Sequence, residues 1–310
     1  MKNTDKYSLQ DRNNLYFSFS FYYRDFPFSY REKGVGWFLE KHYLCPQKLK
    51  KSMTMNKKLT TLLIFFSMLI CSQANAQCTF RNTALSGNEK ISYNLYFNWK
   101  FIWVKAGTAN MNTVYSTFNG TPSFKCSLTT TTSKKVDKFF MLRDTLLVHS
   151  SRDMAPLYYK KVAHEGKRYY VDEATYSYPN GKCAVSMRHL HSDGTVSSEK
   201  KTYDHCVFDM LNIFLRARNF DPTNWKKGHV VNIDITGGSE LTKAKLIYRG
   251  KDKVKADNGT KYDCLVLSYV EKDGKKDKEI VRFFVTDDAK HIPIRLDLFL
   301  KFGAAKAFLA

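Results

Sequence analysis

The sequence lacks the short signatures that usually identify an enzyme or a nucleotide-binding protein. It contains no G-x-S-x-G, no H-E-x-x-H, no phosphate-binding loop and no dinucleotide-binding glycine pattern. It also lacks a C-x-x-C pair, which is the usual mark of thiol redox chemistry or of a cysteine zinc site. We therefore expect no catalytic residue, cofactor or metal ion, and we rank a binding protein above an enzyme.

Acidic residues are scarce relative to basic ones. The 310-residue chain carries 50 Lys and Arg against 29 Asp and Glu, and residues 77–310 alone carry 38 against 24. Such an excess of positive charge attracts anionic surfaces, including lipid head groups, cell-wall polymers and acidic ligands, although it also serves solubility.

A secretory signal lies inside the N-terminal part of the chain. Residues 55–76 have a basic start, an apolar core at residues 62–70 and an A-x-A cleavage site that ends at Ala76. The core is far shorter than the roughly 20 residues that span a bilayer, so we rank a transmembrane anchor lower. A lipoprotein at Cys71 ranks lower still, because Ile70 precedes it. The pattern predicts an exported, periplasmic protein, and this location argues against a nucleic-acid partner.

Residues 1–54 precede this signal and show neither helical nor strand periodicity. We interpret them as an upstream extension from an over-long start assignment, disordered if translated. The expected organisation is an extension at 1–54, a signal peptide at 55–76 and a single β-rich domain at 77–310.

Five cysteines follow the cleavage site, and their wide spacing defines no disulfide framework. Cys183 and Cys206 flank a hairpin that turns at Asp193-Gly194. Pairing about this turn places Cys183 opposite Tyr203 or Asp204, and a bulge would then bring Cys206 within reach. The sequence therefore predicts a Cys183–Cys206 bridge.

Apolar residues that recur at every second position indicate antiparallel strands. Apolar side chains alternate with polar ones at 91–97, 231–235 and 294–300. Asn-Gly and Asp-Gly pairs at 119–120, 180–181, 193–194, 258–259 and 273–274 mark tight turns between about a dozen strands. Short helices are expected at 136–142 and 208–217. The fold class is all-β: a large, strongly curved antiparallel sheet or open barrel with one or two short helices.

Three segments of the sequence resemble a known family. They contain Gly87, Glu89, Tyr93, Ala106 and Gly107 in the first, Asp209 and Arg216 in the second, and Asp288, Pro293 and Gly303 in the last. Their order and spacing are similar to those of the bacterial envelope proteins called domain of unknown function 3108. The resemblance implies an exported β-rich domain and names no reaction.

Three charged residues of this pattern lie beside apolar runs: Glu89, Asp209 and Arg216. Each is either part of a satisfied ion pair or faces a ligand. Asp209 and Arg216 are two helical turns apart, too far to pair directly. We expect Arg216 to pair with Glu89, and Asp209 to find its own partner on the sheet.

Two other groups of polar residues are weaker candidates for a metal site or a catalytic site. His189 and His191 share a strand face and would bind a metal ion if a carboxylate joined them, but solvent-facing histidines explain them better. Asp287 and Asp288 are typical of a turn rather than of an acid–base pair.

The sequence favours a binding or carrier module for an amphiphilic or anionic envelope ligand, such as a lipid. A structural protein that docks on the cell wall or on a membrane complex is the alternative. An envelope hydrolase ranks last.

Overall fold

The computed structural model describes residues 78–99, 102–237, 240–274, 276–300 and 303–310. These residues belong to one compact unit, which includes residues 75–310. The predicted extension at 1–54, the signal peptide at 55–76 and the cleavage site at Ala76 lie outside the described residues. In the part that is described, no helix is long and apolar enough to span a membrane.

The described residues form fifteen strands and two α-helices. The first half contains β1 (Glu89–Trp99), β2 (Ile102–Phe118), β3 (Thr121–Thr132), α2 (Lys134–Asp137), β4 (Leu142–Ser151), β5 (Pro156–Glu165), β6 (Arg168–Ser177), the 3-10 turn η1 (Pro179–Gly181), β7 (Cys183–Leu190) and β8 (Val196–Tyr203). The second half contains β9 (Val207–Phe208), α3 (Met210–Ala217), β10 (Val230–Gly237), β11 (Glu240–Lys255), β12 (Lys261–Asp273), β13 (Lys276–Thr286), β14 (Pro293–Leu300) and β15 (Gly303–Leu309).

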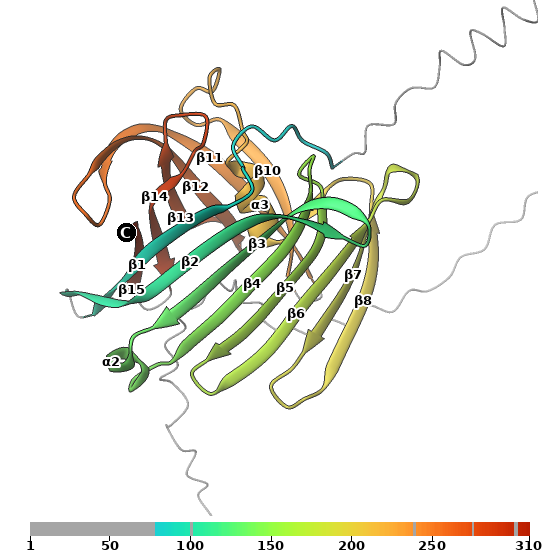
Figure 1. Cartoon of the computed structure of the whole chain (residues 1–310), viewed down its shortest axis with the longest axis horizontal. Helices are drawn as coiled ribbons and strands as arrows, with labels where there is room; N and C mark the ends of the chain where they lie inside the picture. The colour runs from blue at the N-terminus through green and yellow to red at the C-terminus, as the bar shows by residue number, and fades with distance from the viewer. Residues whose placement is uncertain (1–77, 100–101, 238–239, 275, 301–302) are drawn as a thin grey trace, which may run out of the picture. The chain divides into compact units, whose positions relative to one another are not determined.

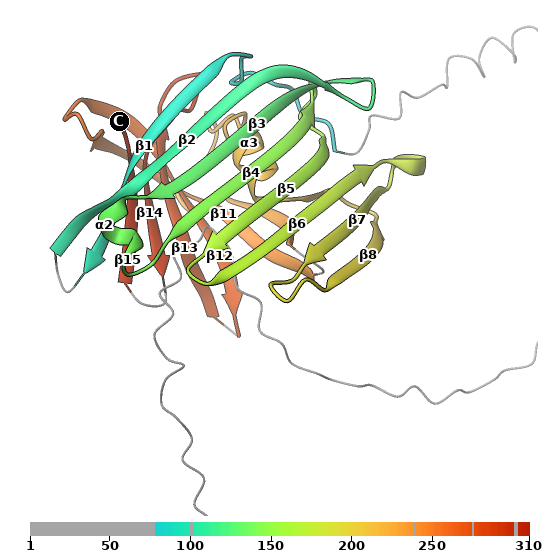
Figure 2. The ribbon, with the colours of Figure 1, turned by 60° about the horizontal axis from the view of Figure 1, so that its bottom comes forward.

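All fifteen strands belong to one barrel-shaped sheet that is nearly closed (Figures 1 and 2). Its order is β8-β7-β6-β5-β4-β3-β2-β1-β15-β14-β13-β12-β11-β10-β9, so the first and last strands of the chain pair at its centre. Every ladder is antiparallel except the short one between β9 and β10. The predicted fold class is confirmed.

Turns close the strands at both ends of the sheet. At one end, called here the hairpin end, lie the turns of the β1–β2, β5–β6, β7–β8 and β14–β15 hairpins, together with α2 between β3 and β4. At the opposite end lie Cys78, the β8–β9 turn and the β11–β12 hairpin. Successive antiparallel strands require this division, because each connection reverses the direction of the chain.

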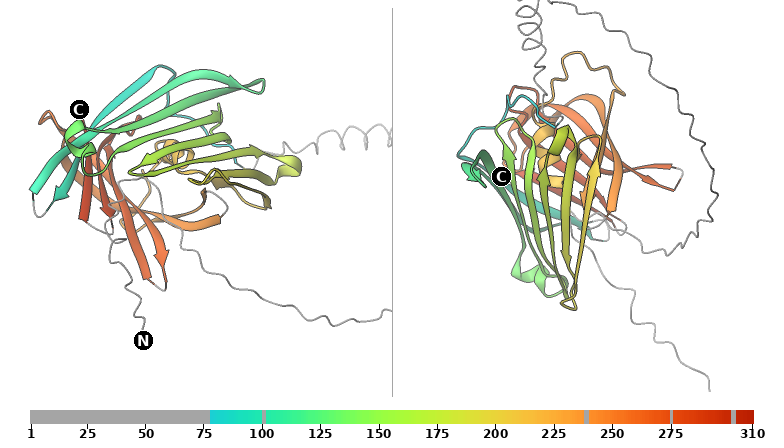
Figure 3. Two further views of the ribbon diagram at one scale, coloured as in Figure 1. Left: turned by 90° about the horizontal axis from the view of Figure 1, so that it is seen from below. Right: turned by 90° about the vertical axis from the view of Figure 1, so that its right-hand side faces the viewer.

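Helix α3 lies inside the curve of the sheet, where it packs against β4, β5 and β10 (Figure 3). Leu211, Ile213 and Leu215 are buried on it. The Ser150 hydroxyl of β4 donates to the side chain of Asn212, which is also buried. The helix therefore belongs to the core of the barrel, as its apolar spacing indicates.

Gly107 shows why a small residue is needed in the first hairpin. A bulge between Leu95 and Tyr96 shifts the β1–β2 register beside it. A Cβ atom at Gly107 would lie only 2.8 Å from the Cα of Thr132 on β3 and closer still to the Thr131 carbonyl. The close approach of β2 and β3 thus requires glycine at this position.

Candidate functional site

The candidate site lies where the two edges of the sheet approach each other, which we call the seam. After β8 the chain leaves one edge through Asp204, His205 and Cys206, and it joins the other edge as β9 beside β10. His205 Nε2 lies 2.6 Å from Asp234 Oδ2 on β10. The Thr236 hydroxyl of β10 donates to the Met187 sulfur of β7 at 2.7 Å. These contacts hold the edges together where only two residues of β10 pair with β9.

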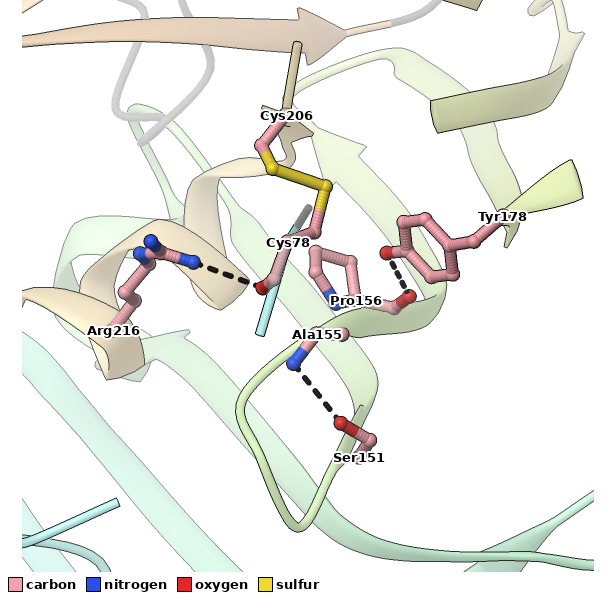
Figure 4. Close-up of a disulfide and its surroundings, with 7 residues drawn as sticks. All are labelled: Cys78, Ser151, Ala155, Pro156, Tyr178, Cys206 and Arg216. Atoms are coloured by element: carbon pink, nitrogen blue, oxygen red, sulfur yellow. Dashed lines mark hydrogen bonds between the residues drawn. A yellow bond between two sulfur atoms is a disulfide. The ribbon is translucent and has the colours of Figure 1, made fainter. Parts of the chain in front are cut away.

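A disulfide between Cys78 and Cys206 fixes the start of the described chain to the seam (Figure 4). The two Cα atoms are 5.3 Å apart. Around it, the Arg216 guanidinium donates to the Cys78 carbonyl at 3.0 Å, and the Tyr178 hydroxyl donates to the Pro156 carbonyl at 2.6 Å.

The predicted Cys183–Cys206 bridge is wrong. Cys183 is a buried free thiol that pairs in register with Tyr203, the neighbour that the turn at Asp193-Gly194 indicates. The β7–β8 ladder continues to Cys183 without a bulge, and the chain then turns toward β10 and carries Cys206 to Cys78.

The predicted Arg216–Glu89 pair is also wrong. Glu89 pairs with Arg218, whose Nη1 and Nη2 donate to the two carboxylate oxygens at 2.6 and 2.8 Å. Arg218 also donates to the Lys290 carbonyl, and its side chain is 1% exposed. Arg218 is two positions after Arg216 at the end of α3, so the two side chains lie on nearly opposite sides of the helix axis, and Arg218 is the one that reaches Glu89 on β1.

Asp209 begins α3 and has its own partners, as expected. Its Oδ1 accepts from the backbone N–H groups of Leu211 and Asn212, and its Oδ2 accepts from the Tyr176 hydroxyl of β6 at 3.0 Å. Burial raises the pKa of Asp209 to about 6, although the hydrogen bonds from Asn212 and Tyr176 oppose this rise. Its role is that of a helix cap tied to the sheet.

A pocket of about 380 Å³ opens at the seam between α3 and β10. Its apolar lining comes from Phe208, Ile213, Phe220, Val231 and Ile233. Arg216, His205, Asn232 and Asp234 contribute its polar groups, and Cys206 of the disulfide forms part of its wall.

Arg216 is the cation of this pocket, and it is half-buried. The rings of Phe80 and Phe208 flank its guanidinium, with centroids 4.7 and 4.8 Å from Cζ. Burial lowers the pKa of Arg216, which nevertheless stays charged. Within the described part of the chain, no carboxylate lies within 4 Å of this guanidinium. The pocket therefore combines a largely apolar lining with a positive charge that forms no ion pair with the described residues.

A second group of buried charges lies on the inner face of β4, β5 and β6. Lys161 Nζ lies 3.2 Å from Glu165 and 3.8 Å from Asp144, and it donates to the Tyr170 hydroxyl at 2.7 Å. Desolvation raises the pKa of Asp144 to about 7; the Lys161 charge opposes this rise, and the neighbouring Glu165 carboxylate adds to it. The sequence analysis did not select this cluster. The alternation of side chains in β5 could have indicated it, because it places Lys161 on the buried face of the strand with Tyr159 and Ala163.

The weaker sequence candidates have local partners. His189 Nδ1 lies 2.5 Å from Asp172, and the rings of His189 and His191 are 4.2 Å apart. Among the described residues, no group of three metal-ligating side chains comes together. Asp288 accepts from Thr286 and from the backbone of Lys290, and Asp287 pairs with Lys251, as expected of turn residues.

The family model for "Protein of unknown function (DUF3108)" matches residues 92–310. The chain belongs to the DUF3108 family. The expected resemblance is thereby confirmed, and Gly107 and Pro293 have structural roles within this DUF3108 domain: close strand contact and the start of β14.

No curated protein matches this DUF3108 member. A solved structure of a β-barrel-like protein of domain of unknown function DUF1849 from Brucella abortus is similar to it at 11% sequence identity. The TM-score is 0.48, and the match covers 74% of this chain and 98% of that chain.

Proposed function

We propose that this DUF3108 member is an exported, non-catalytic binding module that holds one amphiphilic molecule in the seam pocket. The observation that supports this proposal most is Arg216, a half-buried cation with no carboxylate within 4 Å among the described residues. It lies beside the apolar part of a lining whose other polar residues are His205, Asn232 and Asp234. A carboxylate or phosphate head group would accept hydrogen bonds from this guanidinium. The hydrocarbon part would lie against Phe208, Ile213 and Phe220, where burial of apolar surface favours binding.

Two observations support export of the protein. The sequence predicts cleavage after Ala76, and the disulfide begins at Cys78, two residues later. Disulfides persist mainly in oxidising compartments such as the periplasm. A mature chain that starts near Gln77 would be tied to the seam at its first cysteine, so we expect N-terminal sequencing of the protein from its host to begin at or near Gln77.

Uptake of a fluorescent fatty acid tests the binding role. Val231 lines the pocket, whereas its neighbour Val230 is 43% exposed and does not. Val231→Trp therefore adds bulk to the pocket lining, and Val230→Trp, an exposed position outside that lining, is its matched control. We expect at least a tenfold loss of affinity for Val231→Trp and wild-type uptake for Val230→Trp. Equal uptake by both variants, or none by the wild type, would refute the proposal.

A further inference from the structure

Exposed apolar side chains gather at one end of the sheet. Of the nine large hydrophobic residues that are exposed in the described part of the chain, seven lie at the hairpin end and only Tyr115 and Val230 lie toward the other. Five of the seven follow the border from the β1–β2 hairpin past α2 to the β5–β6 hairpin: Ile102, Trp103, Val104, Phe139 and Tyr169. We call these five residues the hairpin rim.

The fold leaves the hairpin rim uncovered for a local reason. The β2–β3 ladder ends at Gly107 and Thr132, so Ile102, Trp103 and Val104 extend beyond β3 and pair on one side only. Helix α2 follows β3 with four residues and buries none of them. It is too short to fold back over the projecting part of β2, and the views in Figures 2 and 3 place both at the same end.

Phe139 is the most exposed member of the rim. Its side chain is 83% exposed, while the neighbouring Phe140 is 9% exposed and packs against Gly166 in the β5–β6 turn. One ring of this pair therefore anchors the loop, and the other points into solvent. Exposing a whole phenylalanine is unfavourable unless a partner covers it.

The rim is surrounded by positive charge. Six basic side chains in the same three segments are exposed: Lys105, Lys134, Lys135, Lys138, Lys167 and Arg168. Asp137 is the single carboxylate of these segments, residues 102–105, 133–139 and 166–169, and Arg143 holds it at 2.6 Å. An anionic partner would thus meet little repulsion here.

We infer that the hairpin rim docks the protein on a lipid bilayer that carries anionic head groups. Trp and Tyr favour the head-group level of a membrane, and each nearby Lys or Arg adds attraction to anionic lipid. The apolar residues project from three separate segments, so each segment can enter the interface independently. A protein interface would instead present a continuous apolar core with few lysines.

Flotation with lipid vesicles tests this inference. The full chain is mixed with vesicles of phosphatidylcholine alone or with 30 mol% phosphatidylglycerol. The test variant combines Phe139→Ser with Lys134→Glu and Lys138→Glu. The matched control combines Tyr115→Ser with Lys255→Glu and Lys261→Glu, exposed residues at or toward the opposite end. All proteins carry the same N-terminal segment, so differences between them report the substituted surfaces.

We expect the wild type and the control to bind the anionic vesicles equally, and the rim variant to bind at least tenfold more weakly. Binding to phosphatidylcholine alone should be weak for all three proteins. Equal binding by the rim variant and the control would overturn the inference. So would binding of the wild type to a soluble polyanion but not to vesicles.

Membrane docking by the hairpin rim and ligand binding by the seam pocket can be refuted separately. Circular dichroism and the fatty-acid uptake of the rim variant report its fold and its pocket, while Val231→Trp leaves the rim intact. If the rim variant keeps uptake and loses vesicle binding, both conclusions stand. If it keeps vesicle binding, docking by this surface is refuted whatever the uptake.

Discussion

At the scale of single residues, Arg218 forms a buried ion pair that joins two distant parts of the chain. Its side chain is 1% exposed and contacts Glu89 through two nitrogens, which joins the end of α3 to the first strand. Removing one partner of a buried ion pair leaves the other charge without compensation.

We expect Arg218→Ala to lower the free energy of unfolding by about 3 to 5 kcal/mol in urea titrations. Arg143→Ala, which breaks the more exposed pair with Asp137, should cost about 1 kcal/mol or less. Similar losses in the two variants would show that the Glu89–Arg218 pair does not have this role.

Asp144 should make the stability depend on pH, in the same direction as Asp209, whose pKa is raised to about 6. The pKa of Asp144 is raised to about 7 from an ordinary value of 3.8, so the folded protein keeps a proton that the unfolded chain releases. The stability that this group contributes is complete below pH 3.8, and it is lost as the pH rises toward 7.

We expect the wild type to lose on the order of 2 kcal/mol between pH 5 and pH 8 through this group, and Asp144→Asn to remove that loss. Asp263→Asn, at an exposed ion pair, is the control and should keep the wild-type profile. An unchanged pH profile for Asp144→Asn in urea titrations would contradict the assignment.

For single residues, the sequence patterns predicted which side chains are buried better than they predicted which side chains pair with each other. Period-two alternation correctly buries Ile91 and Tyr93, and the helical spacing correctly marks Asp209 as needing a partner on the sheet. These patterns could not choose Arg218 over Arg216, because that choice depends on which side of α3 faces β1 in the folded protein. The orientation of the helix is set by its packing against the sheet, which cannot be inferred from a local sequence pattern.

At the scale of elements, turn chemistry was the most informative part of the sequence. The Asn-Gly pair at 119–120 has both residues at positive φ, 46° and 80°, and joins β2 to β3 as a tight hairpin requires. The pairing that connects β1 with β15 has no such signal, because the two strands lie at opposite ends of the sequence. A tight turn determines that the two strands it joins pair with each other, whereas the pairing that closes the sheet depends on all the strands together.

The disulfide acts between elements, since it links residues 128 positions apart. A bridge across so long a loop should stabilise the protein by about 5 kcal/mol in the chain-entropy view. We expect the double variant Cys78→Ser, Cys206→Ser to lose this amount and to become insensitive to reductant. Cys183→Ser should keep the bridge in a non-reducing peptide map. A bridge between Cys183 and Cys206 in that map would contradict the structure.

At the scale of the described domain, three features coincide at the seam. The edges of the sheet meet there, the disulfide ties down the start of the described chain, and the pocket with Arg216 opens. The sequence predicted a curved sheet and a binding role, but not this place, because Cys78, α3 and β10 are far apart along the chain. The hairpin rim lies at the other end, so docking on a membrane would leave the pocket accessible.

Native mass spectrometry is the most direct test of the central claim, which is that the seam pocket holds one amphiphilic molecule. The protein would be purified from its host without detergent, then incubated with a fatty acid and sprayed from a volatile buffer. We expect a single adduct of amphiphile mass on the wild type and on Val230→Trp, and bare protein for Val231→Trp. Bare wild-type protein after incubation, or an adduct that persists in Val231→Trp, would contradict the account.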